Sequence, residues 1–284
     1  MSKELRELLQ SLEEKKAKVR NLIAEDKVTE AENMMEEVRA LQKKVLMQQE
    51  LEASEAFNLD DATPVNNAER DLEAAQAELA DRISQVIQSN GFPIVIGGGH
   101  EVTYGHFKGI QAALKGKIGV INLDAHLDIR ELHKGQGNSG TGFYQIAEEA
   151  KSKQQEFHYL ALGIQDISNT EALFTYAKAQ GTAIVKSEDF HFGNKDAIIQ
   201  QINSFANQVD HVYLTIDMDV FAAAYAPGVS AVAFRGIVPD HVFKVVFDTI
   251  LSLRNLKSMD VAELNPQYDL DNRTARLAAD LIFS

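Results

Sequence analysis

Six short apolar runs, separated by segments with a helical pattern, constrain most strongly what this chain can fold into. The runs are rich in Val, Ile and Leu and almost continuous, which indicates strands buried on both faces of a sheet. Their alternation with helices predicts a mostly parallel sheet covered on both sides, which is a three-layer α/β fold. The expected strands are residues 92–97, 118–124, 157–162, 182–185, 211–217 and 256–262.

Between these runs, apolar residues recur every three or four positions, which predicts the helices that cover the sheet. A further helix should precede the first strand, beginning after an Asn66-Asn67 cap and ending at Asn90-Gly91. The other helices are expected near residues 101–114, 169–180, 194–208, 238–252 and 271–282.

The first 55 residues follow a different pattern, since they are charge-rich and no glycine occurs before Gly91. Apolar residues at helical spacing, a break at residues 24–28 and a capping-box pattern at Thr29 and Glu32 predict two helices. We expect residues 1–55 to form a helical hairpin or coiled coil. Residues 56–67 have the composition of a linker, and residues 68–284 form the α/β domain.

The composition excludes several classes of function. The 42 Asp and Glu residues outnumber the 28 Lys and Arg residues, so the net charge is −14. Such a surface repels nucleic acid and anionic membranes, and neither is an expected partner. The chain has no cysteine, so disulfides, a thiolate zinc site and a thiol nucleophile are excluded. It contains no run of about 18 apolar residues and no signal-peptide core, and we expect a cytoplasmic protein.

Three of the predicted strands end in side chains that bind metals. Alternate residues of an extended chain point the same way, and parallel strands bring their carboxyl ends to one edge of the sheet. A single His or Asp pair there has an ordinary structural explanation, but the coincidence at three strands favours a binuclear site for divalent ions. The candidate ligands are His100 after the first strand, Asp124, His126 and Asp128 after the second, and Asp217 and Asp219 after the fifth.

A pair of divalent ions would activate water for hydrolysis of an electrophilic carbon or phosphoryl centre. Few Lys or Arg residues flank the strand ends, which disfavours a phosphoryl substrate, and the G-x-S-x-G pattern of serine hydrolases is absent. Glu263, after the last strand, is suited to bind a cationic amidinium or guanidinium group. The alternative is that the Glu263 carboxylate caps a helix.

The stretches "GGGHE", "DAHLDIR", "TIDMDVFAAAYAPGVSA" and "DVAELNPQYDLDNRTARLAADLIF" resemble the ureohydrolase family of arginase, agmatinase and formimidoylglutamase. The resemblance extends over about residues 66–284. It is greatest to the formimidoylglutamases, because "FAAAYAPGVSA" replaces the "DPxxxPG" pattern of arginases and agmatinases. It implies an arginase-like fold and hydrolysis of N-formimidoyl-L-glutamate to L-glutamate and formamide, in histidine degradation.

The resemblance also implies two Mn²⁺ ions per chain. The first would be held by His100, Asp124, Asp128 and Asp217, and the second by Asp124, His126, Asp217 and Asp219, with Asp124 and Asp217 bridging.

Further roles are implied for residues around the ions. Glu263 would bind the formimidoyl amidine, and Asp219 would pass a proton to the leaving amine. Arg130, Asn138 and Ser139 are candidates for binding the glutamate carboxylates, although Arg130 could instead form a surface ion pair. His133 is a candidate proton shuttle or a solvated loop residue.

The sequence departs from the family pattern at its start. The family begins with two strands and a glycine-rich loop that are not visible here, and residues 1–55 resemble the N-terminal helical segment of tailed-phage major capsid proteins instead. Residues 92–97 would then form an exposed edge of a six-stranded sheet, and we expect a homo-oligomer. The alternatives are an agmatinase- or arginase-like hydrolase, and an inactive hydrolase remnant joined to a helical scaffold.

Overall fold

The computed structural model describes residues 3–24, 27, 30, 34–38, 40, 41, 44, 45 and 72–284. They belong to two compact units, Met1–Pro64 and Val65–Ser284, which we describe separately. The predicted capping box at Thr29 and Glu32, the linker at 56–67 and the Asn66-Asn67 cap lie outside the described residues. None of the described helices combines the length and the apolar sequence that a membrane span requires.

The first unit contains helix α1 (Lys3–Ala24) and, further along, the helical residues 34–38, 40, 41, 44 and 45. Leu12 and Val19 of α1 are buried against Val38 and Val45. An ion pair between Lys15 and Glu37 links the same two segments. The described residues therefore pack two helical segments through an apolar stripe, as a helical hairpin requires.

The second unit is built on one sheet of six parallel strands, in the order β1-β6-β5-β2-β3-β4. The register places Leu123 opposite Ile216 and Ile216 opposite Val261, so the carboxyl ends of the central strands lie side by side. Each strand agrees with a sequence prediction. Their bounds are β1 Ile94–Ile96, β2 Ile118–Leu123, β3 His158–Ile164, β4 Ala183–Lys186, β5 His211–Asp217 and β6 Leu256–Ala262.

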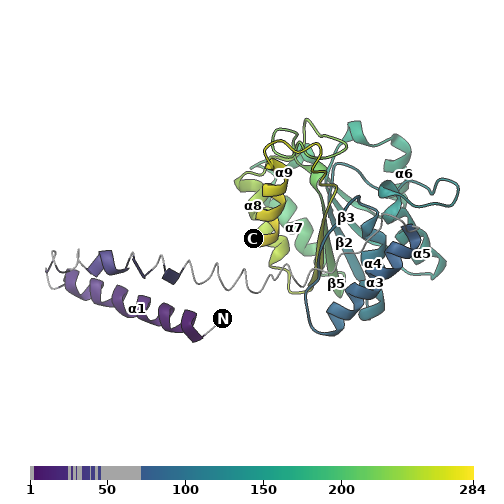
Figure 1. Cartoon of the computed structure of the whole chain (residues 1–284). Coiled ribbons are helices and arrows are strands. Elements are labelled where there is room, and N and C mark those ends of the chain that lie inside the picture. Colours follow the sequence, from purple (N-terminus) through teal and green to yellow (C-terminus); the bar gives the residue numbers. More distant parts are fainter. Residues whose placement is uncertain are drawn as a thin grey trace. The chain divides into compact units, whose positions relative to one another are not determined.

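Helices cover both faces of this sheet (Figure 1). Neighbouring residues of a strand serve opposite faces, so Val120 packs in the cluster under α3–α6 and Ile121 in the cluster under α7–α9. The three-layer α/β fold is confirmed. The first face carries α3 Leu72–Gln88, α4 Val102–Ala113, α5 Gly142–Ser152 and α6 Glu171–Ala179, and the second carries α7 Lys195–Ala206, α8 His241–Leu251 and α9 Arg273–Phe283.

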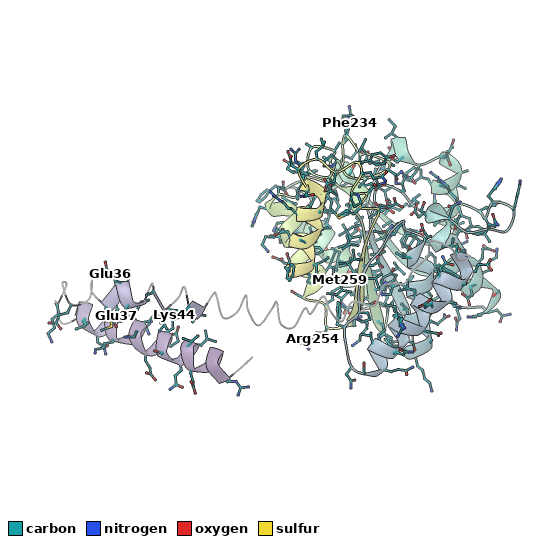
Figure 2. The ribbon with its side chains drawn as sticks, viewed as in Figure 1. Glu36, Glu37, Lys44, Phe234, Arg254 and Met259 are labelled. Carbon is teal, nitrogen blue, oxygen red and sulfur yellow. The ribbon has the colours of Figure 1, made fainter. Side chains whose placement is uncertain are left out.

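The two ends of the sheet are marked by different loops in Figure 2, where Met259 lies within β6. Arg254 precedes β6 at the amino ends of the strands. Phe234, which is 86% exposed, belongs to a loop that follows β5 at the carboxyl ends. The candidate metal ligands lie at the carboxyl ends.

Strand β1 is an edge strand, as the sequence predicted. Among the described residues it pairs with β6 alone, and Ile96 is 63% exposed. The loop that follows β1 is nevertheless tied to β6, because Gly97 N donates to Val261 O at 2.9 Å. The shortest strand, at one edge of the sheet, thus leads directly into a loop that bears a candidate ligand.

Helix α5 was not predicted, because no helix was expected between the second and third strands. It begins at Gly142, directly after a 3₁₀ turn, Ser139–Thr141, that is capped by the Asn138 side chain. Three of the seven preceding residues are glycines, which are typical of loops and give no sign that a helix begins there. Burial of Phe143 and Ile146 against the sheet stabilises α5 in this position.

Candidate metal centre

The first group of candidate ligands surrounds the imidazole of His100. Its Nδ1 atom lies 2.9 Å from Asp128 Oδ2, 3.2 Å from Asp124 Oδ2 and 3.5 Å from Asp217 Oδ2. All four side chains are buried. His100 follows β1, Asp124 and Asp128 follow β2, and Asp217 is the last residue of β5, so three strands contribute.

The second group consists of Asp124, His126 and Asp219. His126 Nδ1 lies 3.0 Å from Asp219 Oδ2 and 3.5 Å from Asp124 Oδ1. Asp124 therefore turns one carboxylate oxygen to each histidine and is common to both groups. Asp217, to which the family resemblance assigns a second bridging role, belongs by this geometry to the group around His100.

Aspartates at the two strand ends shape the backbone that carries the other ligands. Asp124 Oδ1 accepts a hydrogen bond from His126 N at 2.7 Å, and Asp217 Oδ1 accepts one from Asp219 N at 2.8 Å. Each aspartate thus forms a local turn that presents the ligand two residues later. Asp128 has a positive φ of 48°, a left-handed conformation that aspartate tolerates better than most residues.

Both histidines are held as cations when no metal is bound. Burial alone would lower the pKa of His100, but hydrogen bonds with Asp124 and Asp128 raise it well above its usual value. Burial likewise opposes the charge on His126, and its hydrogen bonds with Asp124 and Asp219 raise its pKa to about 11. The positive charges of the two imidazoles thereby offset the negative charges of two of the four carboxylates.

The negative charge on the aspartates of the cluster is unfavourable, with one exception. Burial, together with Asp219 and Asp124, raises the pKa of Asp217 well above its usual value. Burial and the charge of Asp124 raise the pKa of Asp219 to about 7 and also raise that of Asp128. The exception is Asp124, whose pKa is lowered in spite of burial by its hydrogen bonds with both histidines.

This donor set fits a pair of divalent cations. Four carboxylates balance the charge of two divalent ions once both imidazoles are neutral, and a buried acidic cluster is costly without such compensation. Nitrogen and oxygen donors without thiolate are typical of hard to borderline ions. The residues present therefore fit a binuclear metal centre.

Glu263 lies beside this cluster, at the end of β6. Its Oε1 atom accepts from His100 N at 2.9 Å, and its Oε2 atom accepts from Ser230 Oγ at 3.3 Å. Its backbone has a positive φ of 64° and donates to Gly98 O at 2.8 Å. One oxygen thus binds the main chain ahead of α4, in the manner of a cap, while the other makes one long contact.

The candidates for the glutamate end of a substrate lie together in the loop between β2 and α5. Arg130 N donates to Gly140 O at 2.9 Å, and a Cβ on Gly140 would lie 3.3 Å from Arg130 Cδ, so the arginine stem passes over this turn. Asn138 Oδ1 accepts from Gly140 N. Arg130 is exposed and forms no ion pair with any other described residue. His133 is exposed in the same loop.

A buried hydrogen-bond network behind His100 was not predicted from the sequence. His100 Nε2 lies 2.8 Å from Thr215 Oγ1, which lies 2.7 Å from Asp260 Oδ1. The hydroxyl of Tyr213 and Nδ1 of His106, at 2.9 Å, both contact Asp260 Oδ2. The sequence feature that could have indicated this network is the presence of Thr215 and Asp260 inside otherwise apolar strands, where a polar side chain needs a hydrogen-bond partner.

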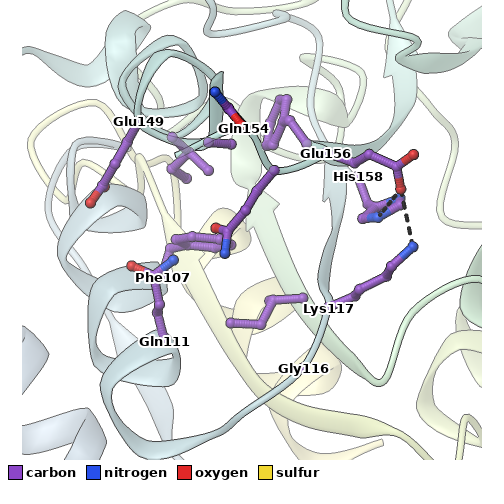
Figure 3. Close-up of a pocket in the computed structure, with 13 residues that line it drawn as sticks. Phe107, Gln111, Gly116, Lys117, Glu149, Gln154, Glu156 and His158 are labelled. Carbon is purple, nitrogen blue, oxygen red and sulfur yellow. Dashed lines mark hydrogen bonds and ion pairs between the residues drawn. The ribbon is translucent and has the colours of Figure 1, made fainter. Parts of the chain in front are cut away.

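A separate hollow of about 600 Å³ lies at the other end of the sheet (Figure 3). Its lining includes Ile118 and His158, the first residues of β2 and β3, whereas the candidate ligands lie at or just after the last residues of their strands. Two of the residues that line it form an ion pair, in which Lys117 Nζ lies 3.0 Å from Glu156 Oε2. The hollow is therefore no part of the candidate metal centre.

Comparison with known proteins identifies relatives along most of the chain. The model of the Arginase family matches residues 24–284. The formimidoylglutamase of Aeromonas salmonicida is 44% identical over 214 residues, which are 75% of this chain and 68% of that protein. The formimidoylglutamase of Rhodococcus jostii is 42% identical over 233 residues, which are 81% of this chain and 72% of that protein.

Solved structures share the fold. The formimidoylglutamase from Bacillus subtilis superposes with a TM-score of 0.70 at 24% identity, covering 77% of this chain and 68% of that one. A variant of Trypanosoma cruzi formiminoglutamase with Mn²⁺ has a TM-score of 0.65 at 26% identity, covering 81% of this chain and 82% of that one.

Proposed function

We propose that this chain, which belongs to the arginase family, hydrolyses N-formimidoyl-L-glutamate to L-glutamate and formamide. The observation that carries the proposal is the pair of histidine–aspartate groups that share Asp124 at the carboxyl edge of the sheet. Curated relatives that are 42–44% identical bear the name formimidoylglutamase, which supports this substrate among the linear amidines of the family.

We further propose that the ions are Mn²⁺, because the Trypanosoma cruzi formiminoglutamase structure contains Mn²⁺. When bound, such a pair supplies Lewis acidity and lowers the pKa of a water to near neutrality. His100, Asp124, Asp128 and Asp217 would hold one ion, and Asp124, His126, Asp217 and Asp219 the other.

Substrate would enter on the side of His126. Its side chain is 20% exposed, whereas each of the four aspartates is at most 10% exposed. Asp219, its ion-pair partner, is then placed to pass a proton to the leaving amine. A proton donor on the accessible side of the cluster can serve a leaving group without crossing the buried carboxylates.

Glu263 would hold the amidine group of the substrate. Its carboxylate lies next to the backbone of His100, and its Oε2 atom makes one long contact, to the exposed Ser230. A charge-assisted hydrogen bond from an amidinium would satisfy this oxygen better than a neutral hydroxyl.

Arg130, Asn138 and Ser139 would bind the glutamate end. Two carboxylates on a substrate need a cation, and Arg130 is an exposed guanidinium without an ion-pair partner among the described residues. Asn138 uses its carbonyl oxygen to cap the adjacent turn, which leaves its amide N–H groups as donors.

We also propose that the chain forms a homo-oligomer in the cytoplasm, with residues 1–55 as a helical arm. Strand β1 pairs with β6 alone among the described residues, and an edge of this kind presents unpaired backbone groups that promote association. The absence of cysteine suits a reducing compartment. The resemblance of residues 1–55 to phage capsid proteins stays a prediction.

The test is glutamate release by the purified chain, with and without added Mn²⁺, against arginine and agmatine as matched substrates. We expect Mn²⁺-dependent turnover of N-formimidoyl-L-glutamate alone. Urea release from arginine or agmatine without glutamate release would assign the chain to another ureohydrolase activity. Two bound ions with no turnover of any of the three substrates would refute the proposed activity.

A further inference from the structure

One buried carboxylate outside the metal centre is connected to it by a continuous hydrogen-bond path. Asp260 of β6 is fully buried, and three side chains converge on it, namely Thr215, Tyr213 and His106. Thr215 alone links it to a candidate ligand, through His100 Nε2. The path runs from β6 across β5 to the loop after β1.

The direction of every hydrogen bond in this path follows from its carboxylate end. An ionised carboxylate only accepts, so the Thr215 hydroxyl must donate its hydrogen to Asp260 Oδ1. The same hydroxyl then has only lone pairs left for His100, and His100 Nε2 must be the donor. His106 Nδ1 is a donor for the same reason.

This polarity has a consequence for the other ring nitrogen. If Nε2 of His100 carries the hydrogen, a neutral imidazole presents a bare Nδ1 atom. That atom faces Asp128, Asp124 and Asp217 at 2.9–3.5 Å, where a ligand nitrogen and three carboxylate oxygens would surround one ion. A tautomer with the hydrogen on Nδ1 would leave two hydrogen-bond acceptors facing each other at Thr215.

His100 needs such support more than the other ligands do. It lies in the loop after the edge strand β1, whereas Asp124 and Asp217 lie at the ends of central strands. Its backbone N–H binds Glu263, and its ring packs edge-on against Phe143 at 5.7 Å between centroids. Neither contact determines which nitrogen carries the hydrogen.

We propose that Asp260 is a positioning residue of the metal centre: acting through Thr215, it holds His100 with Nε2 as hydrogen-bond donor and Nδ1 free to bind the metal. The inference rests on the metal centre of the proposed function, and it does not depend on which amidine is the substrate. Hydrogen-bond partners of this kind orient ligand histidines and raise their basicity.

The test replaces the link and measures metal binding directly. Thr215→Val removes the hydroxyl but keeps the shape of the side chain, and Thr215→Ser keeps the hydroxyl. By titration calorimetry with Mn²⁺, we expect Thr215→Val to lower the affinity for one of the two ions by about 10–100-fold. Thr215→Ser should stay within a few-fold of the unsubstituted chain.

A second control separates positioning from simple stabilisation. Tyr213→Phe removes a donor from the same carboxylate without touching the path to His100. It should lower thermal stability and leave Mn²⁺ affinity within a few-fold. Equal loss of Mn²⁺ affinity in Thr215→Val and Tyr213→Phe, or no loss in either, would show that the network serves folding alone and would overturn the proposal.

A measurement on the unsubstituted chain covers the case in which Thr215→Val does not fold. With nitrogen-15 histidine and cadmium-113 in place of Mn²⁺, spin coupling should appear at Nδ1 of His100, and coupling at Nε2 would overturn the proposal. Metal loss in Thr215→Val with no turnover of N-formimidoyl-L-glutamate by the unsubstituted chain would refute the proposed activity and support the positioning role. A chain that binds no divalent ion would refute both.

Discussion

A single buried carboxylate and a buried cluster of carboxylates lie near each other in this protein, and the protein compensates their charge to different extents. Asp260 is a single carboxylate with three donors, and its hydrogen-bonding capacity is met by Thr215, Tyr213 and His106. The neighbouring cluster gathers four carboxylates around two imidazoles. The first group is complete within the protein, and the second is not.

The difference separates a carboxylate that supports its neighbours from carboxylates that are available to bind cations. A carboxylate that is matched by protein donors needs nothing further, and its removal leaves those donors unsatisfied. A cluster with surplus negative charge is unfavourable in the protein alone and is favourable once cations bind. The raised pKa of Asp217 and that of Asp219, which burial and neighbouring carboxylates shift to about 7, express this surplus.

Removal of a carboxylate from the surplus cluster should have the largest effect on function. Asp217 is a proposed ligand of both ions, so we expect Asp217→Ala to lose bound metal and to reduce glutamate release by more than about a thousandfold, because water activation depends on the ions. Elemental analysis and the glutamate assay measure the two effects. An active, metal-loaded Asp217→Ala chain would refute the assignment of Asp217 as a ligand.

The same kind of change at Asp260 should also lower the stability of the protein when no metal is bound, which the same change at Asp217 should not do. Asp260→Asn places an amide N–H₂ opposite donors, and we expect it to lower the free energy of unfolding of the metal-free protein by about 2–4 kcal/mol. Asp217→Asn is the matched control, and it should leave this free energy unchanged or raise it. Urea denaturation of both variants would contradict the comparison if the losses were equal.

A substitution of Glu263 tests whether this residue binds substrate or belongs to the metal ligands. We expect Glu263→Gln to reduce kcat/KM by about 10–100-fold, since a charge-assisted hydrogen bond contributes about 1.5–3 kcal/mol. Metal content should not change. Ser230→Ala, which removes the partner of Oε2, is the control and should have a smaller effect. Loss of metal in Glu263→Gln would place Glu263 inside the cluster.

The smallest expected effect is a reversal in the pH dependence of stability. Without metal, His126 has a pKa of about 11 when folded and about 6.5 when unfolded, so its contribution is present below pH 6.5 and is lost as pH rises toward 11. Asp219, with a folded pKa of about 7, contributes below about pH 4 and loses this as pH rises through 7. Stability of the metal-free protein should therefore fall from pH 6 to 8, by at most about 1.4 kcal/mol per pH unit for each titrating group.

With metal bound, the sign should change, because both imidazoles are then neutral in the folded state and partly protonated in the unfolded state. Stability of the metal-loaded protein should rise over the same range. Thermal unfolding with and without Mn²⁺ measures both slopes. Slopes of the same sign would mean that the histidines are not ligands.

Much of the architecture could be predicted because its signals are local. A strand buried on both faces needs a continuous apolar run, and each of the six strands has one. The proposed ligands lie at the ends of such runs or just after them, so their meeting at one edge followed from parallel pairing alone.

The features that were missed depend on contacts between distant parts of the chain. Helix α5 begins in a glycine-rich stretch and is stabilised by burial of Phe143 and Ile146, which no local pattern announces. Asp260, Tyr213 and His106 come from two strands and a helix, and each is a single polar residue in an apolar segment. Their partnership becomes visible only when the sheet register is known.

The position of His100 has a mechanical consequence for the sheet. An ion held by His100, Asp124 and Asp217 would join the three-residue edge strand to the two most central strands by bonds stronger than its own ladder. Fraying from that edge would then require ligand exchange at the ion, so the outermost and innermost strands would open together as one cooperative unit. Such a metal would stabilise the edge of the sheet in addition to its part in catalysis.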